Sequence, residues 1–230
     1  PVEKATEFLA STDPWFRPVR CEVGPEGGLW VVDMYRETIE HPEWIPQAWQ
    51  AQLDLYAGND RGRIYRIVPK DDTSPHVFNS LDQASVSQLI EALDASSGTT
   101  RDMAMRLMVE RGEGAFSPGD FEALNDRATS SSKLPEGRVT ALATLAVMGR
   151  CDDSLILGAL SDQHPGVLQF AAALARSRLR GGNGDQFLQQ FQQLADHPSP
   201  HVALAIALAC GESESQSAGQ ILATIASRAD

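Results

Sequence analysis

The chain has 230 residues, enough for one or two domains with a buried core. Hydrophobic residues make up 42% and charged residues 22%, and the 18 glycines and 13 prolines follow no period, which excludes disordered and collagen-like proteins. The formal net charge of −12 repels nucleic-acid phosphates and anionic membrane surfaces, so we expect no nucleic-acid binding.

The most apolar stretches are residues 141–148 and 203–210. Both are shorter than the roughly 18 residues that a membrane-spanning helix needs, so we expect no membrane-spanning segment. The chain opens on Pro1 without an initiator methionine or a leader, which indicates processing or truncation, and we expect truncation. The three cysteines form no C-x-x-C pair and indicate neither a zinc site nor a haem attachment site.

The composition changes near residue 70. All four tryptophans and all three tyrosines lie before residue 69, whereas alanine and leucine recur at helical spacing from Leu81 onward. The sequence therefore predicts two domains, residues 1–70 and 81–230, joined by a linker at residues 71–80.

Three strands are predicted in the first domain. Residues 18–23 alternate in polarity and end at a glycine- and proline-rich turn, and residues 29–34 are β-branched and aromatic, so together they predict a hairpin. A third strand is predicted at residues 62–68, with Ile64 and Arg66 on one face. A long insertion at residues 37–61 separates the second and third strands and carries a helical run at residues 47–55.

The second domain contains a repeat. Residues 160–175 align with residues 194–209, 34 positions later, through a shared leucine, an aspartate and several alanines, and residues 93–108 fall in the same frame. Residues 121–146 supply the intermediate copy, interrupted by a polar loop at residues 129–133. Each unit is a helix, a turn and a second helix, which predicts an α-solenoid of about four helical pairs with a further helix at residues 219–227. The Asp-His-Pro turns favour HEAT-like units.

Four segments of the first domain resemble a known family: Phe16–Val19, Gly24–Arg36, Ile39–Pro42 and Asp60–Ile67. They are similar to the end of the propeller domain of the membrane-bound dehydrogenases of planctomycetes and verrucomicrobia. In that family a sorbosone-dehydrogenase-like β-propeller precedes HEAT-like repeats and a cytochrome c domain. Residues 100–111 resemble the first of those repeats. The resemblance implies a mixed fold class: an antiparallel β blade, the last of a propeller, at residues 1–70, then an all-α HEAT-like solenoid.

The resemblance also implies a function. The chain would be a fragment of a quinone- or cytochrome-linked dehydrogenase that oxidises a sugar or alcohol, located in the periplasm or cell envelope, and inactive alone. A PQQ-like quinone and haem c would belong to the longer protein and no cofactor to this fragment, whose partners would be the rest of its propeller and a cytochrome c domain. The helical region would act as a spacer or docking module. The alternative is a non-catalytic scaffold that binds a protein partner on the solenoid.

The insertion is the candidate site, because in a propeller the loops between second and third strands lie on the face that usually carries the active site. The polar candidates are of three kinds: His41 and Asp33 as catalytic proton acceptors, Arg36 and Arg61 as cofactor-binding groups, and Tyr35 and Glu40 as substrate-binding groups. Each has a structural alternative. Asp33 caps the strand, Tyr35 and Trp44 seal the blade, Arg36 pairs with Glu40, and His41 is a turn residue.

Other motifs favour structural readings. His197 and His201 have a zinc-like spacing, but the prolines between them prevent a shared helical face, so both are predicted to lie in a loop and no metal is expected. Ser130-x-x-Lys133 lies in a polar loop without catalytic partners. The glycines of residues 181–184 are predicted to end one helix and begin the next.

Overall fold

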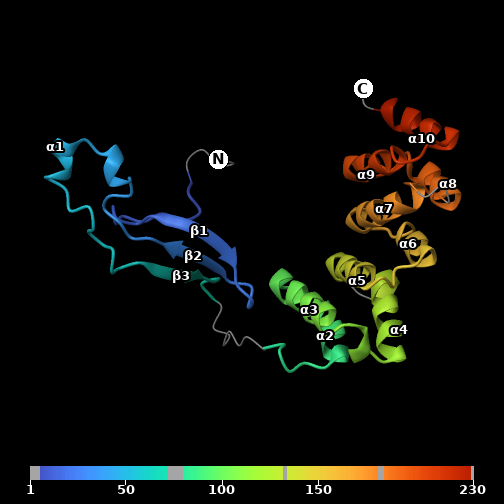
Figure 1. The fold of residues 1–230 in the computed structure, drawn as a ribbon, viewed down its shortest axis with the longest axis horizontal. Helices are drawn as coiled ribbons and strands as arrows, with labels where there is room; N and C mark the ends of the chain where they lie inside the picture. Colours follow the sequence, from blue (N-terminus) through green and yellow to red (C-terminus); the bar gives the residue numbers. More distant parts are fainter. Residues whose placement is uncertain (1–5, 72–79, 132–133, 181–183, 229–230) are drawn as a thin grey trace. The chain divides into compact units, whose positions relative to one another are not determined.

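The computed structural model describes residues 6–71, 80–131, 134–180 and 184–228. The chain divides into two compact units, residues 1–78 and 79–230. The first holds a small three-stranded antiparallel sheet and the second is helical throughout its described part, so the fold class is mixed (Figure 1).

The sheet has the order β1-β2-β3, with each strand antiparallel to its neighbour. Its strands confirm the predicted ones to within a residue at each end: β1 (Pro18–Val23), β2 (Leu29–Asp33) and β3 (Arg63–Ile67). The hairpin closes because the N–H of Gly24 donates to the carbonyl of Gly28 (2.8 Å) and the N–H of Gly27 to that of Gly24 (2.9 Å). Gly27 has a φ of 85°, which glycine adopts without steric cost.

The Glu26 carboxylate connects this hairpin to β3 through hydrogen bonds. The Oε1 atom of Glu26 accepts hydrogen bonds from Nε1 of Trp30 and from Nε of Arg66, both at 2.7 Å. The Glu26 side chain is almost fully buried. A Cβ atom at Gly24 would lie 2.2 Å from Nε1 of Trp30, so a glycine is needed for the indole to reach Glu26.

Both faces of the sheet carry exposed apolar side chains. Val23 and Tyr65 share a face with the buried Val31, and both are exposed, although the Phe16 ring packs edge-on against Tyr65. Ile64 on the opposite face is exposed as well. Each face of the sheet therefore carries apolar side chains that the described chain leaves exposed, although Val31 itself is buried.

The insertion forms a short 3-10 helix, η1 (Pro42–Trp44), and one turn of α-helix, α1 (Gln47–Gln50). The predicted helical run to residue 55 is too long. After α1 the chain continues in turns, and Oδ1 of Asp54 accepts from the N–H of Tyr56 (3.0 Å), a local bond that competes with helix continuation.

Nine α-helices are described in the second unit (Figure 1): α2 (Val86–Ala92), α3 (Gly98–Arg111), α4 (Pro118–Asp126), α5 (Pro135–Val147), α6 (Asp153–Ala159), α7 (Pro165–Arg180), α8 (Asp185–Leu194), α9 (Pro200–Cys210) and α10 (Gln216–Ala226). Several begin at the side-chain caps that the sequence favours. Ser85 and Gln88 form a capping box at α2, as do Ser117 and Asp120 at α4.

These helices pack in consecutive pairs, and α3, α5, α7 and α9 contact one another in turn. Ala171 and Ala175 on α7, like Ala209 on α9, are fully buried, because their small side chains let the two helices approach closely. The aligned positions behave alike: Ala104 and Ala171 are both fully buried. The predicted helix–turn–helix units are thus present, and α10 confirms the further helix.

Two predicted details differ. Residues 127–131 form a π-helical turn, η3 (Arg127–Ser131), so the described part of the predicted polar loop at residues 129–133 begins inside this turn. The prediction that His201 lies in a loop is wrong, because Ser199 is the N-cap and Pro200 occupies the first position of α9, a favoured place for proline. Lys133, residues 181–183 and most of the predicted linker, residues 72–79, lie outside the described residues.

Candidate functional site

Asp33, the last residue of β2, is buried, with 1% of its surface exposed. Its Oδ1 atom accepts hydrogen bonds from the backbone N–H groups of Arg17 (2.8 Å) and Tyr35 (2.9 Å). Its Oδ2 atom is also buried and has no hydrogen-bond partner in the described chain. The carboxylate therefore organises the backbone at the end of the strand, as in the structural alternative, and has no direct access to solvent.

Tyr35 follows in an unusual conformation and connects several chain segments. Its φ of 51° is left-handed, which is uncommon for a residue other than glycine. Its hydroxyl donates to Oδ2 of Asp13 (2.8 Å), its ring lies 5.7 Å from that of Trp15, and the Arg63 guanidinium lies 3.9 Å from the ring centroid. The ring is thus fixed between the N-terminal segment and β3.

Hydrogen bonding shifts the protonation equilibria of this pair. The pKa of Asp13 is below its usual range, first because the backbone N–H of Trp15 donates to the carboxylate and then because Tyr35 does. The pKa of Tyr35 is raised, chiefly because its neutral hydroxyl is the donor to Asp13. Both groups are therefore held in their neutral-pH forms.

Arg36 fastens the two ends of the insertion together. Its Nη2 atom donates to the carbonyl of Leu55 (2.8 Å), and no ion pair joins Arg36 to Glu40 among the described residues. Gly58 lies close by, with a φ of 86°, and a Cβ atom there would be 2.3 Å from the carbonyl oxygen of Tyr35. The insertion returns to β3 through this close backbone approach.

Glu40 and His41 lie apart from this network. His41 is the N-cap of η1, where Nδ1 accepts from the N–H of Glu43 (3.3 Å), and its ring lies 6.4 Å from that of Trp44. Both residues are exposed. In the described chain, no hydrogen bond or ion pair joins either of them to Asp33, Tyr35 or Arg36.

Arg61 is exposed, and its Nε atom lies 3.9 Å from Oδ1 of Asp60. A quinone with several carboxylates needs basic side chains that converge on it. Arg36 donates to Leu55 and Arg61 faces Asp60, so these two arginines do not form a quinone site by themselves. These two predicted cofactor-binding residues therefore do not fit such a cofactor.

The structure adds three residues that sequence reasoning missed: Asp13, Trp15 and Arg63. The sequence does indicate a turn at Asp13, because an aspartate side chain can accept a hydrogen bond from the backbone two residues later. In the structure the N–H of Trp15 donates to Oδ1 of Asp13 (3.0 Å). The strand alternation places Arg63 opposite Asp33 in the sheet. Nothing in the local sequence indicates that Asp13, Trp15 or Arg63 will contact Tyr35.

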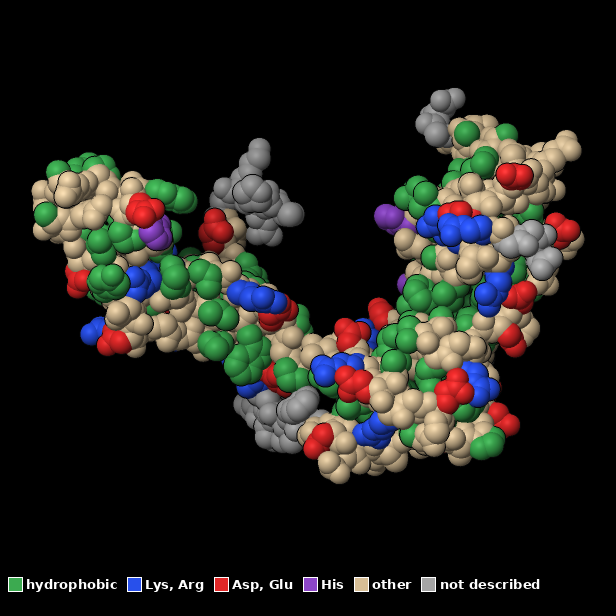
Figure 2. All heavy atoms as spheres, in the orientation of Figure 1, with side chains coloured by type: hydrophobic (Ala, Val, Ile, Leu, Met, Phe, Trp, Pro, Cys, Tyr) green, Lys and Arg blue, Asp and Glu red, His purple; other side chains and the backbone are tan. Residues whose placement is uncertain are grey.

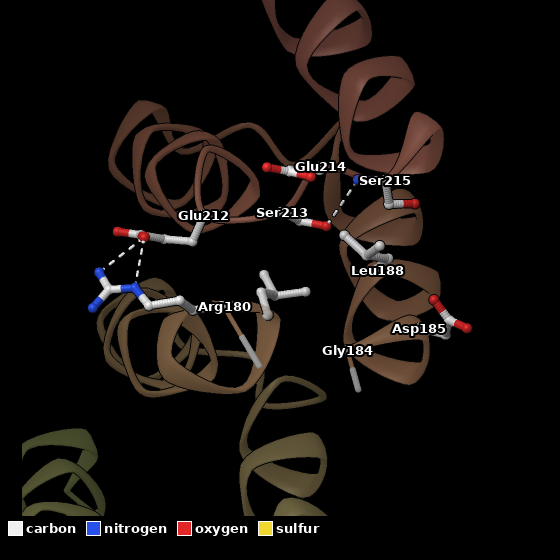
Figure 3. Close-up of a pocket in the computed structure, with 9 residues that line it drawn as sticks. Arg180, Gly184, Asp185, Leu188, Glu212, Ser213, Glu214 and Ser215 are labelled. Carbon is white, nitrogen blue, oxygen red and sulfur yellow. Dashed lines mark hydrogen bonds and ion pairs between the residues drawn. The ribbon is translucent and has the colours of Figure 1, made fainter. Parts of the chain in front are cut away.

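The helical unit has a separate hollow of about 420 Å³ between the end of α7, the start of α8 and the turn before α10 (Figure 3). Glu212 accepts hydrogen bonds there from Nη2 of Arg176 (2.6 Å) and from Nε and Nη2 of Arg180 (3.0 and 2.8 Å). These two arginines lower the pKa of Glu212. The Ser213 hydroxyl accepts from the N–H of Ser215 (3.2 Å), and among the described residues no hydrogen bond joins this hydroxyl to a carboxylate that could act as its base.

Residues 2–71 match the family model of a domain of unknown function, DUF7133. No curated protein and no solved structure matches the chain. The matched segment contains the sheet, the insertion and all six predicted site residues, whereas the helical unit lies outside it.

The described residues also bear on two other kinds of site. They contain no group of three or more histidine, cysteine, aspartate or glutamate residues arranged to hold a metal ion. Among the same residues, no helix is both long and apolar enough to cross a membrane.

Proposed function

We propose that residues 18–67 are one blade of a larger β-propeller, and that the protein is a dehydrogenase of a sugar or alcohol. The observation that carries the proposal is the sheet with exposed apolar side chains on both faces: Val23 and Tyr65 on one, Ile64 on the other. Three strands are close to the minimum for an independent sheet, and they usually need a covered hydrophobic face. Neighbouring blades would cover both faces at once.

The helical unit fits the same proposal as a HEAT-like solenoid that spaces the propeller from an electron acceptor. Its support is the series of contacts from α3 to α5, α7 and α9, in which each helix pair meets the next. A cytochrome c domain and a location in the periplasm or cell envelope follow from the family resemblance and form part of the proposal.

The proposal assigns different tasks to the candidate residues. His41 is exposed, and its imidazole is the proton acceptor for the substrate hydroxyl. Arg61 and Glu40 contact the substrate. Asp33 and Arg36 are positioning residues, because their side chains hold the backbone of Tyr35 and Leu55. Arg36 and Arg61 do not fit the quinone, so residues of the other blades would hold it beside the substrate carbon, where it would accept the hydride that this carbon loses as His41 takes the hydroxyl proton.

The test is quinone-reconstituted dye reduction by the longest natural form of the protein with a panel of sugars and alcohols. His41→Asn keeps a side-chain acceptor at the N-cap of η1 but removes the imidazole, so we expect at least a tenfold loss of kcat with an unchanged thermal midpoint. Glu37→Gln, in the same insertion and exposed, is the control. Full activity in His41→Asn would refute the site assignment. If the wild-type protein reduces the dye with none of the substrates, the proposed dehydrogenase activity is refuted.

A second candidate function has its own observation. Val147 on α5 and Leu204 and Leu208 on α9 are each more than half exposed, which favours a surface that binds another protein. A non-catalytic scaffold would retain a partner from the source organism at a fixed stoichiometry. Leu204→Ser with Leu208→Ser would release that partner, whereas Ser177→Ala, an exposed change on α7, would retain it.

A further inference from the structure

The insertion exposes an unusual set of large apolar side chains, here called the aromatic patch: Ile39, Trp44, Trp49 and Tyr56. Trp44 is 81% exposed, Tyr56 69%, Trp49 65% and Ile39 54%. Tryptophan is highly buried on average, so two exposed ones on neighbouring short helices require an explanation. Figure 2 shows hydrophobic side chains at the surface around η1 and α1.

Hydrogen bonds hold together the two short helices that carry the tryptophans of the patch. The Nε2 atom of Gln50 donates to the carbonyls of Pro42 and Ile45, both at 2.7 Å, which ties α1 to η1. Ile45, which follows η1 in the sequence and precedes α1, is buried. His41 is the N-cap of η1. The fold of this segment therefore buries one isoleucine and leaves both indoles outside.

The insertion is also acidic. Residues 37–61 contain five carboxylates and one arginine, Arg61, which faces Asp60. All five carboxylates are exposed: Glu37, Glu40, Glu43, Asp54 and Asp60. Aromatic faces attract cations, and surrounding carboxylates add to that attraction, so the combination is complementary to lysine and arginine side chains.

We propose that the aromatic patch and its carboxylates are a docking surface for a lysine- or arginine-rich segment of a partner protein. The aliphatic stems of the basic residues would lie on Trp44 and Trp49, and their charged ends would reach Glu40 and Glu43. An anionic membrane surface is the less favoured occupant of an exposed aromatic patch here, because the carboxylates repel it. The proposal does not depend on dehydrogenase activity.

The test uses the 230-residue protein and labelled twelve-residue peptides, one of lysine and one of glutamate, followed by fluorescence anisotropy. We expect the lysine peptide to bind and the glutamate peptide not to bind. Trp44→Ala with Trp49→Ala, which leaves the net charge unchanged, should weaken the binding of the lysine peptide at least tenfold. Glu40→Gln with Glu43→Gln should have an effect of the same size.

Two matched controls separate the patch from the net charge of −12. Phe8→Ala removes an exposed aromatic ring elsewhere in the same unit, and Glu122→Gln with Asp126→Asn removes two exposed carboxylates of α4. Both should retain wild-type affinity. If the tryptophan variant binds within twofold of wild type, or the α4 variant is weakened as much, the proposal is overturned. Self-association lost in the tryptophan variant would overturn it too, because a second copy would then be the occupant.

Discussion

Arg138 on α5 and Asp162 in the turn between α6 and α7 form a two-pronged ion pair. The Nε atom of Arg138 lies 2.7 Å from Oδ2 of Asp162, and Nη2 lies 3.0 Å from Oδ1. Only 14% of the arginine side chain and 7% of the aspartate side chain are exposed. The N–H of His164 also donates to Oδ1 (2.7 Å), so one carboxylate shapes its own turn and joins it to the preceding helix pair.

Asp162→Asn should destabilise the helical unit by about 3 kcal/mol, because it removes the carboxylate that forms a two-pronged ion pair with the mostly buried Arg138 guanidinium. Urea unfolding followed by circular dichroism at 222 nm measures this change. The matched control is Asp196→Asn, at the aligned position of the next repeat, where the aspartate is exposed; we expect less than about 0.5 kcal/mol. Equal effects at the two positions would show that the ion pair contributes no more than an exposed carboxylate.

The predictable part of the fold is the part specified by local sequence. The turn from Gly24 to Gly28 and the alternation around it predict the hairpin, since each residue's preference acts on its own backbone. The small residues at Ala104, Ala171 and Ala205 recur in one frame, and all three are buried, because stacked helices need small side chains at the same place in every unit.

The candidate site was less predictable, because its contacts join distant residues. Nothing local to Asp33 shows that the N–H of Arg17, 16 residues earlier, will donate to its carboxylate. The bond from Tyr35 to Asp13 spans 22 residues, and the left-handed φ of Tyr35 is one that the propensity of tyrosine does not predict. The six candidates come from residues 33–61, and the structure separates Glu40 and His41 from the Asp33–Arg36 network.

Gly58→Ala should destabilise the sheet unit more than Gly27→Ala. Both glycines have nearly the same positive φ, 86° and 85°, so each alanine carries a backbone penalty of about 1 kcal/mol. Only at Gly58 would the new Cβ atom meet backbone, 2.3 Å from the carbonyl oxygen of Tyr35, which adds about 1–3 kcal/mol; at Gly27 nothing lies within 4 Å. Tryptophan fluorescence during unfolding reports on this unit alone, since all four tryptophans are in it. Equal losses would show that the backbone approach relaxes freely.

Tyr35 should titrate late and contribute to stability up to high pH. Its pKa in the folded state is raised above the ordinary 10.0, so its contribution is complete below pH 10 and is lost as the pH rises through the folded-state value. Absorbance at 295 nm should show a late phase that disappears in Tyr35→Phe and moves to lower pH in Asp13→Asn. The control Tyr56→Phe should keep that phase. A late phase that survives in Tyr35→Phe would exclude the hydrogen bond to Asp13 as its cause.

The stabilisation from the hydrogen bond between Asp13 and Tyr35 should also be lost in acid, when the Asp13 carboxylate becomes protonated. Its pKa is lowered from the ordinary 3.8, so its contribution is present above that pH and is lost as the pH falls through the folded-state value. Asp13→Asn should therefore lower the thermal midpoint of the sheet unit at pH 7 and have a diminishing effect as the solution is acidified through that range. Glu7→Gln, exposed in the same N-terminal segment, should have no such pH-dependent effect. A deficit in Asp13→Asn that persists undiminished at the lowest pH would assign it to the shape of the turn, not to the charge.

Glu212 joins the end of α9 to α7 through Arg176 and Arg180, and its charge should matter most near neutral pH. The hydrogen bond from Arg176 is the first cause of its lowered pKa and that from Arg180 the second. A carboxylate with a depressed pKa stabilises the folded state above its ordinary value of 4.5 and loses that contribution as the pH falls through the folded-state value. Glu212→Gln should therefore lower the thermal midpoint of the helical unit at pH 7. The difference from wild type should disappear on acidification, because the protonated wild-type side chain then offers the arginines no more charge than glutamine does.

Glu214→Gln, two residues further on and exposed, should behave like wild type across the same range. A deficit of equal size at pH 3 and pH 7 would mean that the shape of the side chain, not its charge, holds α9 against α7.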